Sequence, residues 1–522
     1  MVLHKKIHII MINLTISALL NTSTPAKGEG LHMLHQNLQA IILAAGKSTR
    51  FNTGSSKLLA PLCGQAVVVY PARLFHELGV EVTVVTGHQK EDIEAMLSAH
   101  IKSDIQFVHQ AEQRGTGHAL LCTRNAWNKE HIIIMNGDMP LVSPEIITEL
   151  YTMHIENNAA VSFVTAPNND PSFASYGRII QNGESIKIVE ASEFKGQPIP
   201  QEYPVNAGIY LITKDFLLNY CNALQQNNTS NEFYITDLIG IANEAGKSVC
   251  TLNVSCDDIR GINTLQELAT AEKIKRTQLM HAFMKAGVRF MLPETTLLDL
   301  DVTIGRGTVI GAGVHLLGKT TIGAQCTVHP YTILDNAILE DNVTIHSHSV
   351  ISNSTIHTRA HIGPFAHLHL DTSVGERAYV GNFVEVKKST LGAGTKAKHL
   401  TYLGDAIIGN HVNIGAGTIV CNHDGKRKHK TTIKDGAYIG SNNTLIAPLT
   451  IEEDAYTAAG STINKDVPAN ALAIGRALQV IKEGYALKLR GTQPATTISS
   501  EHKEITPTFT YTTPATKASE DL

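Results

Sequence analysis

The chain has 522 residues, of which 43% are hydrophobic and 17% charged, and its formal net charge is −4. This length allows two or three globular domains. The small net charge excludes a global positive field that would draw the protein to nucleic acid or an anionic membrane. The seven cysteines are an odd set without a C-x-x-C pair. We therefore expect no disulfide framework and no zinc site, and a reducing, cytoplasmic environment.

Residues 1–36 carry a signal that conflicts with a cytoplasmic location. Lys5 and Lys6 precede an apolar run over 7–20, which is typical of a signal peptide and too short for a comfortable transmembrane helix. No clear small-x-small cleavage site follows. Two interpretations stay open: a membrane-directing segment, or an upstream extension outside the fold with Met33 as an alternative start. We expect the extension and no stable membrane insertion.

Residues 37–263 alternate short apolar runs with helical patterns. Such alternation predicts an α/β domain of Rossmann-like type, with a mostly parallel sheet and helices on both faces. Ligands bind such sheets at the carboxyl ends of strands, here in the loops after Leu43 and Met135. We expect strands at 38–43, 80–85, 105–108 and 132–135, and helices at 66–78 and 90–97. A charged helical pattern over 264–286 predicts a helical linker spanning 264–292.

From Ile304 onward an aliphatic residue returns every six positions, at Ile304, Ile310, Leu316, Ile322 and Val328. This period fits neither a helix nor an ordinary strand, but it fits a prism of short strands whose coils bury their apolar column by stacking. We therefore expect a left-handed parallel β-helix of hexapeptide repeats within 293–490, ending in a short amphipathic segment at 480–490. A purely structural solenoid is the alternative. The tail 491–522 is rich in Thr, Ser and Pro, which predicts disorder.

The loop after the first strand has the composition of a phosphate-binding loop. Gly46 and its small neighbours let the backbone approach a nucleotide, and Arg50 and Lys57 offer cations to phosphate. Gln110 has an amide that can read a base edge. Asp138, at the end of another strand, has a carboxylate suited to Mg²⁺.

With further segments in the same order, these motifs resemble the bacterial bifunctional N-acetylglucosamine-1-phosphate uridylyltransferase / glucosamine-1-phosphate N-acetyltransferase family. The resemblance covers roughly residues 37–485 and includes the segments around Gly177, Glu190, Asn206 and Asn263. The family has glycine where this chain has Ser48, and a serine is less suited than glycine to a left-handed backbone. Ser56 stands where proline is usual.

The resemblance implies a role for each motif of the first half. A sugar-1-phosphate oxygen would attack the α-phosphorus of UTP, with Arg50 and Lys57 as catalytic cations and Mg²⁺ held by Asp138 and Asn263. Nucleotide and sugar would be bound by Leu43, Ala44, Ala45, Gly46, Lys57, Gln110, Gly115, Thr116, Asn136, Gly137, Asp138, Gly177, Glu190, Asn206 and Asn263.

Polar insertions interrupt the hexad register, and residues that leave a repeat usually form its functional face. By the same resemblance this face would transfer an acetyl group from acetyl-CoA, with His399, beside Tyr402 and Asp405 in sequence, as the general base. The sugar phosphate would be bound by His369, Lys387, Tyr402, Asn413, Asn422 and His423, and acetyl-CoA by Ala416, Ser441, Ala459 and Arg476. The basic run 426–430 is either a solvated loop or an attractor of CoA phosphates.

Two departures concern the sugar phosphate. The family pattern Phe-Ala-Arg-Leu-Arg-Pro reads Phe365-Ala-His367-Leu-His369-Leu370 here, and His423 replaces a tyrosine. A neutral histidine cannot give the two-pronged contact of a guanidinium. The resemblance implies a cytoplasmic homotrimer that makes UDP-N-acetylglucosamine from small-molecule substrates. The alternatives are a monofunctional uridylyltransferase with a structural β-helix, a non-enzymatic sensor assembly, and an enzyme for another base or sugar.

Overall fold

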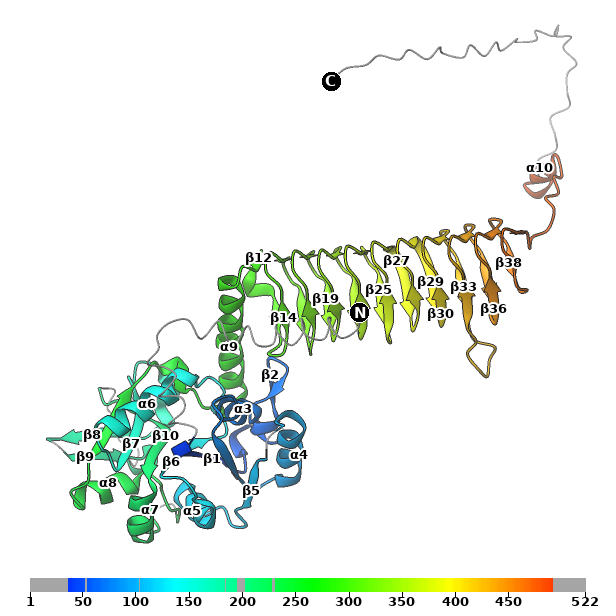
Figure 1. The fold of residues 1–522 in the computed structure, drawn as a ribbon. Coiled ribbons are helices and arrows are strands. Elements are labelled where there is room, and N and C mark those ends of the chain that lie inside the picture. Colours follow the sequence, from blue (N-terminus) through cyan, green and yellow to red (C-terminus); the bar gives the residue numbers. More distant parts are fainter. Residues whose placement is uncertain are drawn as a thin grey trace, which may run out of the picture. The chain divides into compact units, whose positions relative to one another are not determined.

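The computed structural model describes residues 36–51, 54–102, 104–183, 185–194, 202–227 and 231–491 (Figure 1). The expected N-terminal extension and C-terminal tail lie outside these ranges, apart from Gln36 and Gly491. The chain divides between Gly475 and Arg476 into two units. The second contains α10 (Tyr485–Leu489), which is shorter than the amphipathic segment expected at 480–490 because Gly484 takes a left-handed conformation before it. In the described ranges, no helix is both long and apolar enough to cross a membrane.

A nine-stranded sheet forms the core of the first half of the chain. Its main path runs β11-β7-β10-β6-β1-β4-β5, and all neighbours pair in parallel except β10, which is antiparallel to β6 and β7. The expectation of a mostly parallel sheet is confirmed. The strands are β1 (Leu38–Ala44), β4 (Glu81–Thr86), β5 (Gln106–His109), β6 (His131–Asn136), β7 (Val161–Ala166), β8 (Arg178–Asn182), β9 (Ser185–Val189), β10 (Val205–Thr213) and β11 (Val249–Asn253).

The four strands expected from sequence agree with β1, β4, β5 and β6 to within one residue at each end. The first expected helix begins three residues late, because Pro61–Leu62 and Gln65–Ala66 form the small antiparallel pair β2 and β3. The helices of this half are α3 (Val69–Glu77), α4 (Lys90–His100), α5 (Thr116–Cys122), α6 (Pro144–Glu156), α7 (Lys214–Tyr220) and α8 (Asp237–Glu244).

The carboxyl ends of β1 and β6 lie next to each other in the sheet. The two strands pair in parallel, and the amide of Gly137 donates to the carbonyl oxygen of Leu43 at 2.9 Å. The loops that follow Leu43 and Asn136 are therefore held side by side. This is the edge at which a parallel sheet binds its ligands.

The helix α9 (Leu265–Lys285) belongs to the cores of both halves. Its Ala271 is buried with the sheet residues, whereas Met280 and Phe283 are buried with the β-helix residues. Thr264 caps its first turn and Glu267 completes a capping box, which fixes where the helix starts. The predicted helical linker is thus a packed element. A further contact between the halves joins the amide of Leu300 to the carbonyl oxygen of Cys63 at 2.9 Å.

The β-helix runs from β12 (Arg289–Phe290) to β39 (Leu472–Ala473) as short strands that pair in parallel from coil to coil. Thr303 pairs with Thr321 and Thr321 pairs with Ile338, so one coil takes 18 or 17 residues. The aliphatic residues of the six-residue period are all buried, as the sequence predicts. Buried hydroxyls bind the backbone between coils: Thr320 donates to the carbonyl of Leu317 at 2.7 Å and accepts from the amide of Ala337 at 3.2 Å.

Adjacent residues of one β-helix strand should differ sharply in their effect on stability. Leu339 is 1% exposed and Ile338 is 48% exposed. Leu339→Ala should lower the free energy of unfolding by about 2–5 kcal/mol, because it leaves a cavity in the stacked column. Ile338→Ala should change it by less than about 0.5 kcal/mol. Urea unfolding followed by circular dichroism measures both, and equal losses for the two variants would contradict the inward orientation of the column.

Candidate active sites

The loop after β1 forms one wall of the first candidate site. Ala44 and Ala45 are buried, whereas Gly46 is exposed with open space beside its Cα. Ser48 has φ of +54°, so this departure from the family falls on a left-handed backbone position where glycine is less strained. The Ser48 hydroxyl accepts a hydrogen bond from the Lys57 amide at 3.2 Å. The Ser56 amide, which a proline would lack, donates to the side chain of Gln89 at 2.7 Å.

Two cations and two oxygen ligands meet above the ends of β1 and β6. The Lys57 ammonium donates to Oδ2 of Asp138 at 2.5 Å and to Oδ1 of Asn263 at 2.7 Å. The Arg50 guanidinium donates to the same Asn263 oxygen at 2.9 Å. Residues that are far apart in the sequence, and that were predicted separately as phosphate and metal ligands, thus form one cluster. An oxygen pair that binds an ammonium in this way can also bind a metal cation.

A second set of contacts holds the segment that carries Asn263. The Ile262 amide donates to the carbonyl oxygen of Asp138 at 3.0 Å, and the Gly261 amide donates to the Tyr176 hydroxyl at 2.8 Å. One carboxylate oxygen of Glu267 accepts from the amide of Asn263 at 2.7 Å. The sequence analysis missed Tyr176 and Glu267. Glu267 carries a signal that could have been found, since it stands three residues after a threonine at a helix start.

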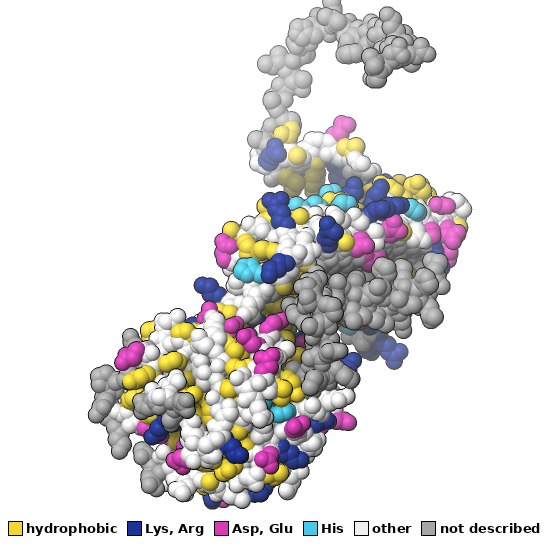
Figure 2. All heavy atoms as spheres, turned by 60° about the vertical axis from the view of Figure 1, so that its left-hand side comes forward, with side chains coloured by type: hydrophobic (Ala, Val, Ile, Leu, Met, Phe, Trp, Pro, Cys, Tyr) yellow, Lys and Arg dark blue, Asp and Glu magenta, His cyan; other side chains and the backbone are white. Residues whose placement is uncertain are grey.

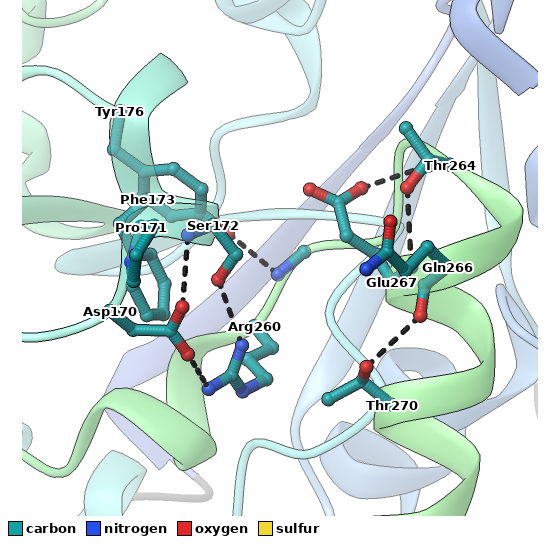
Figure 3. Close-up of a pocket in the computed structure, with 11 residues that line it drawn as sticks. Asp170, Pro171, Ser172, Phe173, Tyr176, Arg260, Thr264, Gln266, Glu267 and Thr270 are labelled. Carbon is teal, nitrogen blue, oxygen red and sulfur yellow. Dashed lines mark hydrogen bonds and ion pairs between the residues drawn. The ribbon is translucent and has the colours of Figure 1, made fainter.

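A cavity of about 440 Å³ lies against this segment. Figure 3 shows Arg260 pointing to Asp170 and Ser172 on one side of the cavity, while Glu267 and Thr264 are hydrogen-bonded at the start of α9 on the other. Arg260 forms an ion pair with Asp170 and donates to the Ser172 hydroxyl at 3.0 Å. The hydrogen bond from Arg260 lowers the pKa of Asp170 to about 2. The pair therefore stays ionised and anchors the chain just before Gly261.

The predicted base-reading residues lie around the start of α5. The Gln110 side chain is buried, and its amide nitrogen lies 3.2 Å from the Gly115 carbonyl oxygen and 3.0 Å from Nδ1 of His118. The Thr116 hydroxyl accepts from the Ile235 amide at 3.2 Å. Gly115 has φ of +96°, and a side chain there would collide with backbone of the segment before Ile235. The three predicted residues are thus neighbours, with Gln110 fixed in orientation.

The predicted amino-sugar residues also come together. The Asn206 amide donates to the Gly177 carbonyl at 3.0 Å, and an ideal Cβ on Gly177 would lie 3.4 Å from a carboxylate oxygen of Glu190. Burial raises the pKa of Glu190, whose carboxylate accepts from the Thr236 hydroxyl at 3.0 Å. The Asn206 side chain donates to the Tyr210 hydroxyl at 2.6 Å. These contacts form a small polar surface beside the same sheet.

The second candidate site lies on the outer face of the β-helix. Figure 2 shows histidine side chains along the β-helix, with Lys and Arg side chains near them. His399 lies in β29 (Lys396–Gly404), and its Nδ1 is 2.8 Å from the side-chain oxygen of Asn382 in β27 (Tyr379–Lys387). Because an amide oxygen can only accept, Nδ1 carries the proton and Nε2 keeps its lone pair. The sequence placed His399 beside Asp405, but the carboxylate of Asp405 accepts from Asn422 at 2.6 Å instead.

Asn382 is the contact that the sequence analysis missed. It lies in a polar insertion that was recognised, 17 residues before His399, and the two residues are opposite each other in the register of β27 and β29. One coil is 17 or 18 residues long, so adding one coil length to each polar residue would have found the pair.

A polar column lies beside His399 on the same coils. Glu385 is opposite Tyr402, and Lys387 is opposite both Gly404 and His369 of β25 (His367–His369). A side chain at Gly404 would overlap the Tyr402 hydroxyl and the Asn422 amide, so glycine is required there. The predicted sugar-phosphate residues His369, Lys387, Tyr402 and Asn422 therefore share one stretch of the face.

The remaining predicted residues of this face lie apart from that column. Asn413 of β31 (Asn413–Ile414) pairs with Lys396 and Tyr438, on a different stretch of the coils. His423 lies in an exposed loop, where its Nδ1 accepts from the Gly425 amide at 3.3 Å. In the basic run after it, Asp424 accepts from two backbone amides and pairs with His429 at 2.7 Å. The run is therefore a tight, exposed turn.

One corner of the β-helix brings together three of the predicted acetyl-CoA residues. Ala416, Ser441 and Ala459 each come directly before a left-handed residue, namely Gly417, Asn442 and Gly460. His399 has the same position before the left-handed Leu400. Backbone hydrogen bonds join these corners: the Gly417 amide donates to the Leu400 carbonyl, Asn442 to Ala416, and Gly460 to Ser441. Arg476 belongs to the second unit and is exposed.

Two family models match the chain. Residues 40–199 match the MobA-like NTP transferase domain, and residues 301–336 match the bacterial transferase hexapeptide model of six repeats. The first match covers β1 and the phosphate-binding loop, and the second covers the first coils of the β-helix.

Similar proteins share almost the whole described chain. A protein of Koribacter versatilis (strain Ellin345) named bifunctional protein GlmU is 38% identical over 469 residues, which are 87% of this chain and 97% of that protein. The proteins of the same name from Geotalea uraniireducens (strain Rf4) and Brevibacillus brevis (strain 47) are each 39% identical over 459 residues, 87% of this chain and 99% and 98% of theirs. The chain therefore belongs to the family of the bifunctional protein GlmU.

Proposed function

We propose that the chain makes UDP-N-acetylglucosamine in two steps. The β-helix transfers acetyl from acetyl-CoA to glucosamine-1-phosphate, and the first half then transfers uridylyl from UTP to N-acetylglucosamine-1-phosphate with release of pyrophosphate. The observation that carries this proposal is that each half holds its own polar cluster built from residues distant in sequence, one around Lys57 and one around His399. The bifunctional relatives favour it over a monofunctional enzyme with a structural β-helix.

Uridylyl transfer needs charge neutralisation more than proton transfer. The attacking sugar phosphate is already an anion, so no base has to act on it. Lys57 and Arg50 lie together at the carboxyl ends of β1 and β6, where they can bind the phosphate oxygens on which negative charge develops. The loop around Gly46 leaves open space for the nucleotide to approach the backbone. Positioning and charge therefore account for catalysis at this site.

The same cluster fits the magnesium ion that the family resemblance implies. Asp138 and Asn263 both offer oxygen atoms, which Mg²⁺ prefers, and both aim at one cationic point because both accept from the Lys57 ammonium. When bound, the ion would supply Lewis-acid polarisation of the phosphates. The contacts of Ile262 and Glu267 hold the two ligands at this point.

Removal of one ligand should abolish only the uridylyl transfer. Asp138→Ala should lower the rate of pyrophosphate release by about two to three orders of magnitude, because the developing charge loses a preorganised partner. The same sample is its own control, since acetyl transfer to glucosamine-1-phosphate should proceed at the wild-type rate. Wild-type pyrophosphate release by this variant would refute the assignment of Asp138.

Acetyl transfer requires a base, because only the free amine of glucosamine-1-phosphate attacks the thioester. The proton leaves the ammonium for Nε2 of His399, which is the ring nitrogen that Asn382 leaves available. Asn382 is a positioning residue that sets this tautomer. Tyr402, Asn422 and Lys387 line the neighbouring stretch on which the sugar phosphate would lie, and the corner with Ala416 and Ser441 would take acetyl-CoA.

The base and its partner can be separated by kinetics. His399→Ala should lower kcat for acetyl transfer by about two to four orders of magnitude. Asn382→Ala should lower kcat less, and both variants should keep the wild-type KM for glucosamine-1-phosphate, since neither residue is proposed to bind the phosphate. Uridylyl transfer should be unchanged in both. Acetylation by His399→Ala at the wild-type rate would falsify the proposal of a base.

We also propose that the chain is a homotrimer assembled through the β-helix, located in the cytoplasm where UTP and acetyl-CoA are made. An outer corner of the β-helix carries a column of exposed apolar side chains: Tyr331 is 59% exposed, Phe383 56% and Leu400 60%. Tyr331, His348, Phe365 and Phe383 stack on one another with ring centroids 5.0–5.3 Å apart. A contiguous apolar strip of this kind is usually covered, and closed cyclic symmetry covers it with identical copies.

Disruption of the strip should dissociate the assembly. Light scattering should give the wild type three times the mass of one chain at micromolar concentration. Phe383→Asp should shift the mass toward that of a single chain, because a carboxylate would be buried without a partner. Ile407→Asp, at a residue 48% exposed in β30 (Ala406–Ile408) of the other β-helix sheet, is the matched control and should stay trimeric. A monomeric wild type would contradict this arrangement.

A further inference from the structure

We propose that His367, His369 and Glu385 bind a divalent transition-metal cation of the Zn²⁺ type, and that this cation binds the phosphate of the sugar substrate. The second part rests on the proposed acetyl transfer, whereas the first part does not. Within the described ranges, these three side chains form the single group of three or more His, Cys, Asp and Glu residues whose ligand atoms converge, all within 4.8 Å of one another.

The β-helix register places these three ligands on one face. His367 and His369 are two positions apart in β25, with the buried Leu368 between them, so both point outward. Glu385 is opposite His367 on the next coil. The two imidazole rings are stacked with centroids 4.3 Å apart, and Nε2 of His369 is 3.1 Å from Oε1 of Glu385.

The donor set selects the kind of ion. Two imidazoles and one carboxylate are ligands typical of a zinc site that keeps a fourth position open. Ligand atoms on a tetrahedral Zn²⁺ are about 3.4 Å apart for bonds near 2.1 Å, so small side-chain rotations suffice here. Burial together with the neighbouring His369 lowers the pKa of His367, which favours the neutral form that binds metal. The absence of cysteine pairs, which argued against a zinc site in the sequence, does not bear on histidine ligands.

The open position accounts for the loss of arginine. The family resemblance places guanidinium groups at both histidine positions, and neither imidazole can replace one. Two neutral imidazoles, one carboxylate and one divalent ion together carry a net charge of +1, the charge of a single guanidinium. The ion would offer its free position to a phosphate oxygen. Lys387, opposite His369 on the same face, adds a second positive charge for the same phosphate and weakens the affinity for the ion.

Metal binding can be tested without any activity. Full-length protein is stripped with a chelator, dialysed and titrated with Zn²⁺ against a chromophoric competitor, and Co²⁺ is used as an absorbing probe of the ligand geometry. We expect one ion per chain in the wild type. His367→Ala and Glu385→Gln should each weaken binding at least tenfold. The matched control is His346→Gln, which alters a histidine stacked on His329 in the same β-helix and should bind zinc as the wild type does.

The role toward phosphate is tested by the KM for glucosamine-1-phosphate, with acetylated product measured by chromatography. Stripping the wild type should raise this KM about ten- to hundredfold, with kcat little changed, because one charge-assisted contact is lost. His369→Arg should bind no zinc and yet keep a low KM that does not depend on metal. This variant separates a positive charge at the site from the ion itself.

Each outcome decides one statement. Failure of the wild type to bind zinc stoichiometrically at micromolar concentration, or unchanged binding in both ligand variants, overturns the metal site. Stoichiometric binding with a KM that is unaffected by stripping overturns the contact with phosphate. No acetylation in either the stripped or the loaded protein overturns the proposed acetyl transfer, while the zinc titration still decides the metal site.

Discussion

The β-helix depends on one constraint: a coil of short strands can bury its aliphatic side chains only against the next coil. The constraint fixes the register at one residue per 17 or 18, because any slip would turn the buried column outward. Function uses the same register. His399 meets Asn382, and Glu385 meets His367, because each pair is one coil apart. A face that is regular in structure can therefore carry ligands that are irregular in sequence.

The first half solves the opposite problem, since its ligands come from segments with no common period. Here the strand order brings the ends of β1 and β6 together, and a helix cap holds the third segment in place. The result is a point at which one ammonium satisfies a carboxylate and an amide oxygen. Charges gathered in advance need little rearrangement when a phosphate arrives, which is the physical basis of the proposed uridylyl transfer.

The sequence predicted those features that depend on periodicity and on local turns. The aliphatic column, the strand ends at Leu43 and Met135 and the helix of 264–286 follow from such local rules, and the structure agrees with them. The partners of the site residues are a different matter. Tyr176 supports Gly261 through a contact between residues 85 positions apart, and nothing in the local sequence of either indicates it. Only tertiary packing decides such pairs, so the sequence found the catalytic candidates but not what orients them.

The two cores share α9, and this has a consequence for how the chain is made. During synthesis the first half leaves the ribosome before the residues that complete its packing: Ala271 closes its core, Leu300 binds Cys63, and Asp301 accepts from Arg73 at 2.8 Å. The nucleotidyltransferase fold is thus complete only after the first strands of the β-helix have been translated. The growing chain must protect an unfinished apolar surface over that interval, and the order of translation makes the second half a folding partner of the first.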